Sequence, residues 1–343
     1  MPVDPSVPLV LTGAAGWLGQ NLVRDLAPTG RQVRCLVHHE AEAPLLELVG
    51  PSVEAVVGDV RDPATLRVLF DGLQRATVVH AAGVIHPQGA TRPFFDVNVG
   101  GTQLVLDAAR RAQAGRFIHV SSNSPFGAND HPWERFTEES PTNPYLAYGR
   151  SKLEGEELVR RAHDRGDLET VVLRPPWFYG PYQPERQNQF LSAVRRGRFP
   201  LVGDGRQQRS MVYTGNLVAA CRLAEVAEAA PGRAYWIADA EPYELSAVFD
   251  GVREALAAEG LAVASRRLPA IPAPLAALAA RADAVLQGAD RYVAPLHVLG
   301  ELRDTIACDI SRARVELGYE PAVGLVEGMR TAIRWCLQRG VRL

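Results

Sequence analysis

A tyrosine and a lysine stand four residues apart in the segment Tyr148-Gly149-Arg150-Ser151-Lys152. On a helix this spacing places the two side chains on one face, about one turn apart. An ammonium beside a phenol favours the phenolate and so lowers a pKa that is about 10 when unperturbed. A tyrosine tuned in this way exchanges a proton with an alcohol or a ketone near neutral pH. The pair therefore predicts acid–base catalysis at a carbon–oxygen group.

Lys152 is the only lysine in a chain of 343 residues, in which lysine and arginine together number 37. An arginine side chain is a planar fork that keeps its charge, whereas the lysine ammonium is a compact donor whose pKa can move. A GC-rich coding sequence would produce the same excess of arginine without a functional cause. The functional interpretation of Lys152 therefore depends on its neighbour Tyr148.

Two serines stand where a substrate oxygen would need a second hydrogen-bond donor. Residues 117–120 read as a strand, and Ser121 and Ser122 follow it directly. Ligands of open α/β sheets bind at the carboxyl edge, where such a strand ends. We expect a serine hydroxyl at this place to donate to the same substrate oxygen as Tyr148.

Three glycines lie between an apolar run and the start of a helical pattern, in Thr12-Gly13-Ala14-Ala15-Gly16-Trp17-Leu18-Gly19. Gly13 permits a tight turn, Gly16 lets the backbone approach a pyrophosphate, and Gly19 lets the helix pack closely on the strand. The helix N-terminus presents free N–H groups to the phosphates. Glycines also mark simple turns, but their place between the first strand and the first helix predicts dinucleotide binding.

The end of the second predicted strand, Leu36-Val37-His38-His39, bears on which dinucleotide binds. An acidic residue at this place binds the ribose 2′-hydroxyl of NAD and repels the 2′-phosphate of NADP. That acid is absent, so we expect NADP or NAD, with NADP slightly favoured. His38, His39 or Arg34 would then contact the phosphate. Both histidines would equally suit a solvated loop in an enzyme that uses NAD.

Short apolar runs alternate with helical patterns through the first half of the chain. The predicted strands are 8–11, 33–37, 53–57, 77–80, 117–120 and 170–173, and the predicted helices are 18–26, 63–70, 94–112 and 146–162. Asp62 reads as the N-cap of the second helix, with Pro63 at its first position. The alternation is typical of βαβ units with helices on both faces of a parallel sheet. We predict an α/β fold of the Rossmann type, a doubly wound parallel sheet with a smaller, mostly C-terminal substrate-binding lobe.

The pattern changes after Pro175. Aromatic residues and prolines crowd 177–184, a short helix follows near 190–196, and a glycine-rich turn lies at 202–205. Further helices are predicted at 216–227, 245–258 and 325–338, with a strand at 234–237. We assign residues 1–176 with 208–240 to a dinucleotide-binding domain and residues 177–207 with 241–343 to the substrate-binding lobe. A cleft between them is the natural ligand site.

Composition and charge exclude several functional classes. The 37 basic and 39 acidic residues nearly cancel, which argues against binding to nucleic acid or an anionic membrane. No signal peptide is evident in residues 1–10, and prolines and charges break the apolar stretch 268–286, so we expect no membrane span. The cysteines are far apart and no histidines have a metal-binding spacing, so we expect free thiols in a reduced, cytoplasmic protein and no metal. These cysteines are Cys35, Cys221, Cys308 and Cys336.

Together these motifs resemble the extended short-chain dehydrogenase/reductases, a family that includes NAD-dependent epimerase/dehydratases and 3β-hydroxysteroid-dehydrogenase-like reductases. The likeness covers nearly the whole chain, including Leu317-Gly318-Tyr319-Glu320-Pro321 and Glu327-Gly328. Ser122 matches the catalytic serine of the family because it stands four residues before Phe126-Gly127, although tyrosine is commoner than phenylalanine there. The resemblance implies a catalytic set of Ser122, Tyr148 and Lys152. In this set Tyr148 is the acid/base, and Lys152 binds ribose hydroxyls and lowers the tyrosine pKa.

The resemblance also implies cofactor contacts around the same sheet edge. Asp59 with Val60 would contact adenine, Asn98 would support the site, and Pro175 would lie near the nicotinamide. The full implied set is Gly13, Ala15, Gly16, Trp17, Leu18, Gly19, His38, Asp59, Val60, Ala81, Ala82, Gly83, Asn98, Tyr148, Lys152 and Pro175. Ordinary capping or turn roles would also explain Asp59 and Asn98.

The sequence separates the reactions of this family only in part. Nucleotide-sugar epimerases typically carry an asparagine within the stretch that corresponds to 175–181, where this chain has none. The 4,6-dehydratases carry an Asp-Glu pair where this chain has Asn123-Ser124. Arg209 instead favours a nucleotide-sugar enzyme, because it stands where the sugar enzymes contact a diphosphate. A salt bridge to its own loop would equally explain this residue. Trp177, Phe178, Tyr179 and Phe190 would line an aromatic pocket if they face the cleft, and would equally suit a core.

We therefore predict an NAD(P)-dependent oxidoreductase that transfers hydride between nicotinamide and a ketone or secondary alcohol of a largely apolar small molecule. The alternative is a nucleotide-sugar 4-epimerase that uses the same groups with tightly bound NAD. The predicted substrate contacts are Ser122, Trp177, Phe178 and Arg209. By resemblance, we also expect a homodimer formed through the two long helices 94–112 and 146–162.

Overall fold

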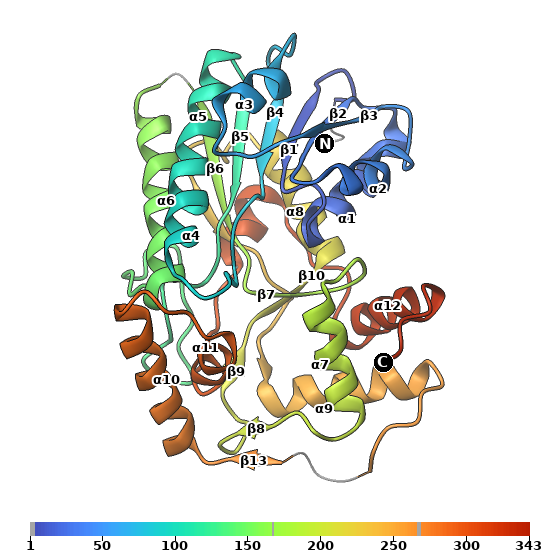
Figure 1. Ribbon diagram of the computed structural model, residues 1–343, viewed down its shortest axis with the longest axis vertical. Coiled ribbons are helices and arrows are strands. Elements are labelled where there is room, and N and C mark those ends of the chain that lie inside the picture. The colour runs from blue at the N-terminus through green and yellow to red at the C-terminus, as the bar shows by residue number, and fades with distance from the viewer. Residues whose placement is uncertain (1–3, 167, 266–268) are drawn as a thin grey trace.

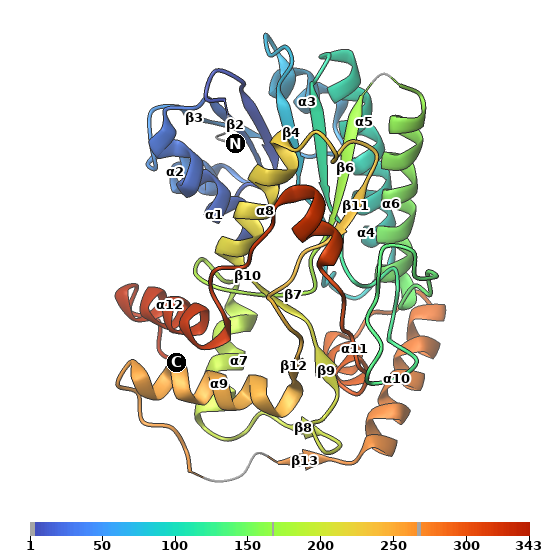
Figure 2. The ribbon, with the colours of Figure 1, turned by 180° about the vertical axis from the view of Figure 1, so that it is seen from behind.

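The computed structural model describes residues 4–166, 168–265 and 269–343. Residues 1–3 and 268, which belong to the two segments assessed above for targeting and membrane insertion, lie outside the described residues. Within the described ranges, no helix is long and apolar enough to cross a membrane. Figures 1 and 2 show the main sheet and its helices in the upper half of the view, with the C-terminal helices beneath.

Seven parallel strands form the main sheet of the described chain, in the order β3–β2–β1–β4–β5–β6–β11. They are β1 (Leu9–Thr12), β2 (Val33–Val37), β3 (Val53–Val57), β4 (Thr77–His80), β5 (Arg116–Val120), β6 (Glu169–Arg174) and β11 (Ala234–Trp236). The strand order reverses between β1 and β4, and in sheets of this type the ligand crevice lies outside the carboxyl ends at that point. The predicted Rossmann-type, doubly wound parallel sheet is confirmed.

Helices cover both faces of the sheet because its strands are apolar on both sides. Leu9 and Val10, for example, are both buried but belong to different cores, since side chains alternate along a strand. Figures 1 and 2 show the two helix layers from opposite sides. One layer holds α1 (Trp17–Leu26), α2 (Ala43–Glu47) and α8 (Thr214–Val226), with the short 3-10 turns η1 (Ala27–Thr29) and η2 (Glu40–Glu42). The other holds α3 (Pro63–Phe70), α5 (Thr102–Arg111) and α6 (Leu146–Asp164).

The long helix expected over 94–112 is divided into three segments. They are α4 (Arg92–Phe95), the π-helical segment η3 (Asp96–Gly101) and α5. A π-helical turn re-aims the side chains that it carries and is frequent at functional sites. The start of α3 agrees with the sequence, because the Asp62 carboxylate accepts two backbone amides of the first turn.

Beyond β6 the described chain adds three small two-stranded sheets, β7–β10, β9–β12 and β8–β13. Their strands are β7 (Trp177–Tyr179), β8 (Leu201–Val202), β9 (Gln208–Arg209), β10 (Met211–Tyr213), β12 (Tyr243–Glu244) and β13 (Ala270–Ile271). The helices of this part are α7 (Glu185–Arg195), α9 (Leu245–Ala258), α10 (Ala273–Gly288), α11 (Ala294–Glu301) and α12 (Leu325–Gln338), with the π-helical segment η4 (Ala313–Leu317).

The C-terminal half contributes to two different cores. Apolar residues of α7, α9 and α12 pack together in a core of their own. Ile306, Cys308 and Tyr319 instead join the core of the main sheet, together with their neighbours in the segment 306–319. The chain therefore returns to the sheet after β11, and the division of the residues into two domains stays a prediction.

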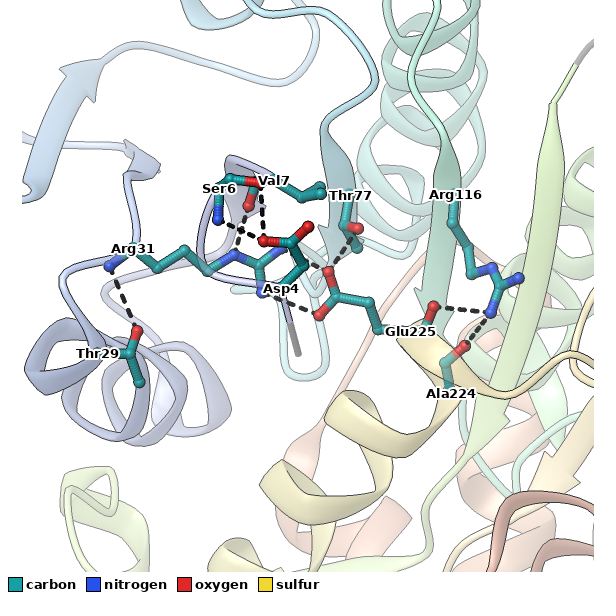
Figure 3. A network of polar contacts seen from close by, with 9 residues as sticks. All are labelled: Asp4, Ser6, Val7, Thr29, Arg31, Thr77, Arg116, Ala224 and Glu225. Atoms are coloured by element: carbon teal, nitrogen blue, oxygen red, sulfur yellow. Dashed lines mark hydrogen bonds and ion pairs between the residues drawn. The ribbon is translucent and has the colours of Figure 1, made fainter. Parts of the chain in front are cut away.

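A buried ion pair holds the amino-terminal edge of the sheet together (Figure 3). Arg31 is 1% exposed, and its two terminal nitrogens contact the carboxylate of Glu225 on α8 at 2.5 and 2.9 Å. Its Nε donates to the carbonyl oxygen of Val7 at 2.7 Å, and the hydroxyl of Thr77 donates to Glu225 at 2.6 Å. Thr77 begins β4, so this pair lies at the edge opposite the carboxyl ends of the strands.

Removing one partner of this pair leaves a buried charge without compensation. We expect Arg31→Ala to lower the free energy of unfolding by about 3 kcal/mol, measured by urea denaturation. Arg222→Ala is the matched control, because Arg222 and Asp25 form an ion pair at 3.1 Å whose side chains are 39% and 35% exposed. Its expected loss is below about 1 kcal/mol. Equal losses for the two variants would contradict this account.

Candidate active site

Ser122 and Tyr148 meet where α6 crosses the loop that follows β5. Gly149 permits this approach, because a Cβ atom at its position would lie 2.4 Å from the carbonyl oxygen of Ser124. Ser122 is buried, and its side chain is a hydrogen-bond partner of Tyr148. The structure thus brings the predicted serine and tyrosine together. No sequence pattern indicated that a glycine at position 149 lets α6 approach the loop after β5 so closely.

The protein's own groups raise the pKa of Tyr148 to about 12. Burial is the largest cause, because it disfavours the charged phenolate, and the hydrogen bond with Ser122 offsets only part of this effect. Lys152 is not among the groups that shift this pKa. The expectation that Lys152 lowers the pKa of the phenol is therefore wrong for these residues by themselves. Tyr148 stays protonated at neutral pH.

Lys152 is buried against the end of β5. Its Nζ donates to the carbonyl oxygen of Val120 at 2.8 Å, and the residue is 5% exposed. Burial lowers the pKa of Lys152 to about 8, while the nearby carboxylate of Glu156 acts to raise it. The side chain is therefore mostly cationic at pH 7. An ammonium has three N–H donors, and the hydrogen bonds of the described residues use one of them.

A buried ion pair lies next to Lys152 on the sheet side of α6. The carboxylate of Glu156 accepts from Arg174 Nη2 at 2.7 Å and from its Nε at 3.2 Å, and also accepts from the hydroxyl of Ser121. The guanidinium of Arg174 lies 4.5 Å from the centre of the Phe126 ring. No motif indicated this pair, although a carboxylate four residues after Lys152 on the predicted helix was a usable signal.

The three glycines lie between β1 and α1, and two of them have steric reasons to be glycine. Gly13 has φ +70°, and a Cβ atom there would lie 2.7 Å from backbone atoms of Ala81 and Ala82. At Gly19 a Cβ atom would lie 2.4 Å from the carbonyl oxygen of Gly13, so a larger residue would push α1 away from the loop. Gly16 is exposed and precedes α1 without a side-chain cap.

This uncapped N-terminus of α1 fits the pyrophosphate of a dinucleotide. The first amides of a helix have no partner within it, and the helix dipole favours an anion at this end. Of the predicted contacts here, Leu18 is buried in the sheet core, so only its backbone can face a ligand. The indole nitrogen of Trp17 donates to the carbonyl of Pro181 at 2.9 Å, and the carbonyl of Ala15 accepts from Gln20 at 2.9 Å.

The loop after β4, Ala81–Gly83, is fixed by Asn98 of η3. The amide oxygen of Asn98 accepts from the backbone nitrogen of Val84 at 2.8 Å. Its amide nitrogen donates to Val84 and to the hydroxyl of Ser151, both at 3.0 Å. Val60, in the loop after β3, packs against the same π-helical segment. Asn98 therefore bridges the loop after β4 and α6, which is a supporting role rather than helix capping.

A carboxylate lies at the end of β2, where the sequence pattern showed only histidines. Glu42 accepts from the backbone nitrogens of His38 and His39 at 2.8 and 3.1 Å. His38 is exposed, and Asp59 at the end of β3 is half-buried and pairs with Arg61 at 2.6 Å. The hydrogen bond with Arg61 is the largest cause that holds the pKa of Asp59 below its usual value. No spacing rule connects Glu42 to this place, so it was not among the predicted site residues.

Arg34 does not reach the carboxyl edge of the sheet. Its Nε pairs with Glu54 on β3 at 2.8 Å, and its Nη1 donates to the carbonyl of Asp71 at 2.7 Å. It stands near the start of β2, far along the strand from His38. The proposal of Arg34 as a phosphate contact is therefore wrong.

Strand β7 places its aromatic side chains alternately on two sides. Trp177 packs on the C-terminal core, with its ring 5.4 Å from that of Phe190, while Phe178 packs on the sheet core, 6.0 Å from Trp17. Tyr179 is fully buried, and Pro175 is buried directly after β6. The structure thus favours the core interpretation for Trp177, Tyr179 and Phe190 over that of a shared aromatic pocket.

Arg209 is enclosed rather than presented to a ligand. It is 6% exposed on β9, and its Nη2 donates to the backbone carbonyl of Glu301 in α11. Burial is the largest cause that lowers its pKa. The two roles considered from the sequence were a diphosphate contact and a salt bridge to its loop. The structure instead gives the guanidinium a backbone carbonyl as its partner.

Residues from the C-terminal half approach Tyr148 through an aromatic cluster. The ring of Phe94 lies 5.5 Å from that of Tyr148 and 5.4 Å from that of Tyr292. The hydroxyl of Tyr292 and Nδ1 of His86 lie 2.5 Å apart. Burial lowers the pKa of His86 to about 4, so its imidazole is neutral at pH 7. Tyr292 has no motif around it, so no sequence pattern predicted that it would lie here.

Helices α10 and α11 also fix the start of α6. The buried carboxylate of Asp283 lies 2.9 Å from Nδ1 of His297 and accepts from the side-chain nitrogen of Gln287 at 3.0 Å. The other side-chain atom of Gln287, its oxygen, accepts from the backbone nitrogen of Ala147 at 3.2 Å. Ala147 precedes Tyr148, so the C-terminal half determines where the first turn of α6 lies.

The described residues contain no group of three or more histidine, cysteine, aspartate or glutamate side chains that could hold a metal ion. All four cysteines are free and buried. Burial raises the pKa of Cys35 and of Cys221 to about 12, so these thiols stay protonated at neutral pH.

A model of the NAD dependent epimerase/dehydratase family matches residues 9–238, more than half of the chain. The chain belongs to this family. The matched region spans β1 to β11, so it includes the glycine loop, the serine after β5 and the tyrosine and lysine of α6.

Two curated relatives of this chain are named as reductases. The 4-hydroxy-2-methyl-3-oxo-4-farnesyl-3,4-dihydroquinoline-1-oxide ketoreductase of Stigmatella aurantiaca is 33% identical over 239 residues, 68% of this chain and 69% of the relative. The 2-alkyl-3-oxoalkanoate reductase of Stenotrophomonas maltophilia is 29% identical over 330 residues, 94% of this chain and 97% of the relative.

A solved structure of the same architecture is DesIV, a dTDP-glucose 4,6-dehydratase of Streptomyces venezuelae with NAD and TYD bound. It is 25% identical, covers 97% of this chain and 98% of its own, and has a TM-score of 0.76. The epimerase/dehydratase fold of the chain is therefore established by sequence and by structure. The family is NAD-dependent, and a preference for NADP finds no support among these relatives.

Proposed function

We propose that this protein is an NAD(P)-dependent oxidoreductase that reduces a ketone, or oxidises the corresponding secondary alcohol, of a largely apolar small molecule. The observation that carries this proposal is the meeting of Ser122 with Tyr148, next to Lys152, at the sheet edge that also holds the glycine loop. The names of the two reductase relatives support carbonyl chemistry.

The chemistry that NAD(P) would supply here, when bound, is hydride transfer to the carbonyl carbon or from the alcohol carbon. Tyr148 gives a proton to the substrate oxygen in reduction and takes it back in oxidation. Because burial keeps this phenol protonated at neutral pH, it stands in the form that reduction needs. The hydroxyl of Ser122 orients the same oxygen. The N–H groups of Lys152 that remain beside the Val120 bond are available to ribose hydroxyls.

The proposed cofactor contacts are those predicted from the sequence, with one change, which is that NAD rather than NADP is favoured. The first amides of α1 would hold the pyrophosphate, and the loop Ala81–Gly83 would line the dinucleotide. The carboxylate of Glu42 at the end of β2 now favours NAD over NADP, because it repels a 2′-phosphate placed beside His38.

The alternative function is a nucleotide-sugar 4-epimerase, which would use the same groups with a retained cofactor. The burial of Arg209 argues against the epimerase function, because in an epimerase this residue would have to face a diphosphate. The experiment that decides is turnover of added NADH and NADPH with a panel of apolar ketones. The proposal predicts net cofactor consumption, with NADH the better donor. Interconversion of nucleotide sugars without net consumption would establish the alternative.

The carboxylate of Glu156 should determine the alkaline limit of ketone reduction. Lys152 has a pKa lowered to about 8, and its charge is lost as the pH rises through that value. Glu156→Gln removes the charge that raises this pKa, so the alkaline limb of kcat/KM should move down by about half to one pH unit. Profiles between about pH 6 and pH 10 measure the shift, with circular dichroism to verify folding.

Glu157→Gln is the control for that experiment. Glu157 lies on the same helix but pairs with Arg161 in solvent, with the side chains 43% and 57% exposed. Its alkaline limb should coincide with that of the wild type. If the alkaline limb of kcat/KM does not move in Glu156→Gln, or moves to higher pH, Lys152 does not control the alkaline limit.

Three further expectations stay proposals. We propose a homodimer formed through α5 and α6, which light scattering of the purified protein tests directly. We also propose a cytoplasmic location, for which the free thiols are the supporting observation. The assignment of residues 177–207 with 241–343 to substrate binding is the third.

A further inference from the structure

A buried histidine lies where the sheet changes its strand order, next to the predicted dinucleotide site. His80 ends β4 and is the register partner of Thr12, which ends β1 and directly precedes Gly13. The strand order reverses between β1 and β4, so both residues lie at the edge where ligands of such sheets bind. The side chain of His80 is fully buried. It is therefore placed to fix the loops around the crevice rather than to contact a ligand.

Both ring nitrogens of His80 have hydrogen-bond partners. Its Nδ1 lies 2.7 Å from Thr12 Oγ1, and its Nε2 lies 2.9 Å from Thr102 Oγ1 at the start of α5. The backbone nitrogen of Ala82, in the loop after β4, donates to the same Thr12 Oγ1 at 3.2 Å. Thr102 Oγ1 donates to the backbone carbonyl of Asn98 at 2.7 Å. One imidazole thus connects the end of β1, the loop after β4 and the π-helical segment η3.

These contacts determine the direction of every hydrogen bond in the network. A hydroxyl carries one hydrogen, and that of Thr102 goes to a carbonyl oxygen, which can only accept. Thr102 can therefore only accept from His80, so Nε2 carries the proton of the imidazole. Burial lowers the pKa of His80 to about 3, so the ring is neutral at pH 7 and its Nδ1 carries no proton. This Nδ1 accepts the hydroxyl hydrogen of Thr12, whose oxygen accepts from Ala82.

The network leads to the loops that flank the predicted pyrophosphate and to the catalytic helix. On one side, a Cβ atom on Gly13 would lie 2.7 Å from the backbone nitrogen of Ala82, so the two loops touch there. On the other side, Asn98 donates to Ser151 on α6, the helix that also carries the candidate catalytic tyrosine. Loss of the imidazole would release these loops from each other and from η3.

We propose that His80, as the tautomer with its proton on Nε2, is a positioning residue for the dinucleotide. Its two hydrogen bonds hold the glycine loop, the loop after β4 and η3 at the spacing that cofactor binding requires. This inference rests on the proposed function, which supplies the dinucleotide. It predicts that His80 controls cofactor affinity although it touches neither cofactor nor substrate.

His119 is a matched control for His80. It is the register partner of His80 on β5, the two rings stack with their centres 5.5 Å apart, and both are buried. Within the described ranges, however, neither ring nitrogen of His119 has a hydrogen-bond partner. The variant His119→Phe therefore exchanges an equally buried ring without breaking a hydrogen bond.

Calorimetric titration with NAD, on variants whose folding is verified by circular dichroism, measures the predicted effect. His80→Phe should raise the Kd by about tenfold or more, because Thr12 and Thr102 both lose their hydrogen bonds to the ring. His119→Phe should bind NAD within about twofold of the wild type. In ketone reduction, the loss in His80→Phe should appear in the KM for NADH, with kcat within about threefold of the wild type. A His80→Phe variant that is less stable but binds NAD like the wild type would overturn the proposal.

Two variants of Thr102 test the same network if His80→Phe does not fold. Thr102→Val removes the hydroxyl that accepts from Nε2 of His80, whereas Thr102→Ser keeps it. We expect the valine variant to raise the Kd for NAD by about fivefold and the serine variant to stay within about twofold of the wild type. Equal affinities of the two variants for NAD would show that this hydrogen bond does not position the cofactor.

The tautomer of His80 is measured without cofactor or turnover, by long-range proton–nitrogen NMR correlation with isotope-labelled histidine. The signals of His80 are those that disappear in His80→Phe or shift in Thr102→Val. We expect a proton on Nε2 and none on Nδ1 between about pH 5 and pH 9, since burial keeps the ring neutral. A proton on Nδ1 would contradict the hydrogen-bond directions on which the proposal stands.

These measurements separate failure of this inference from failure of the proposed function. If the wild type binds NAD but reduces no ketone, and His80→Phe weakens binding, the positioning role stands and the proposed function falls. If the wild type reduces ketones and neither His80→Phe nor Thr102→Val changes the Kd, the positioning role is wrong and the proposed function stands. A wild type that binds no dinucleotide contradicts both.

Discussion

Tyr148→Phe should lower kcat for ketone reduction by about a thousandfold, because it removes the one hydroxyl placed to give a proton to the substrate oxygen. Ser122 remains in this variant, but a serine hydroxyl that only orients the oxygen cannot replace the acid. The substitution deletes a single oxygen atom from a half-buried ring that packs on Phe94, so the fold should be unchanged. Stopped-flow measurement of cofactor oxidation at saturating ketone gives the rate.

Tyr145→Phe is the matched control. Tyr145 stands three residues earlier on the same segment, and its buried hydroxyl has no hydrogen-bond partner among the described residues. Removing that hydroxyl should leave kcat within about threefold of the wild type. Tyr145→Phe should also bind the dinucleotide with the Kd of the wild type. If Tyr148→Phe retained more than about a tenth of the activity, Tyr148 would not be the general acid.

Gly13→Ala should weaken dinucleotide binding by about a hundredfold or more and also lower the melting temperature. The residue has φ +70°, a conformation that costs an alanine about 1–2 kcal/mol. Its Cβ would also lie 2.7 Å from backbone atoms of Ala81 and Ala82, which cannot rotate away as a side chain can. The loops after β1 and β4 must therefore separate, and these are the two loops that flank the predicted pyrophosphate. Calorimetric titration with NAD measures the Kd.

Gly30→Ala isolates the backbone strain from the steric effect. Gly30 has φ +74°, but a Cβ atom there would meet nothing within 4 Å. It ends the turn after α1, away from the ligand edge. This variant should lose about 1 kcal/mol of stability and bind NAD like the wild type. A Kd for Gly13→Ala within about threefold of the wild type would mean that the glycine loop does not hold the dinucleotide.

The sheet could be predicted from the sequence because its strands carry a strong local signal. Most of them are short apolar runs buried on both faces, although the edge strand β3 has Glu54 and Val57 exposed. The runs at 33–37, 53–57 and 77–80 correspond to observed strands residue for residue. The small sheets were not predictable in this way. Strands of two or three residues such as β8 and β9 depend on partners far away in the chain.

The long helix expected at 94–112 illustrates a different limit. Its apolar periodicity is helical throughout, but η3 inserts a π-helical turn around Asn98. That turn is stabilised by bonds from Asn98 to Val84 and Ser151, which are tertiary contacts that no local pattern encodes. The helices α10 and α11 were missed because their prolines were interpreted as breaks in the pattern, whereas Pro274 and Pro295 lie in the first turns of these helices, where proline is tolerated.

Motifs identified the side chains of the candidate site but not their electrostatics. The spacing of Tyr148 and Lys152 predicted that they share a helix face, which the structure bears out. It also suggested an acidified phenol, and this is wrong for the protein's own groups, because burial outweighs the hydrogen bond from Ser122. Burial depends on the packing of Phe94 and Tyr292, which come from distant parts of the chain.

The substrate side was the least predictable part of the site. Trp177 was a candidate for either a pocket or a core and packs on the C-terminal core. Arg209 was a candidate for either a diphosphate contact or a salt bridge to its loop, and it donates to a backbone carbonyl instead.

The origin of the hydrogen on the product carbon is the most direct test of the account. The enzyme is given a ketone that it reduces and a cofactor carrying deuterium on one face of nicotinamide C4, and the alcohol is analysed by mass spectrometry. Direct hydride transfer predicts one deuterium on the carbinol carbon from one of the two labelled faces and none from the other. An alcohol without deuterium from either labelled cofactor would contradict hydride transfer from the nicotinamide at this site.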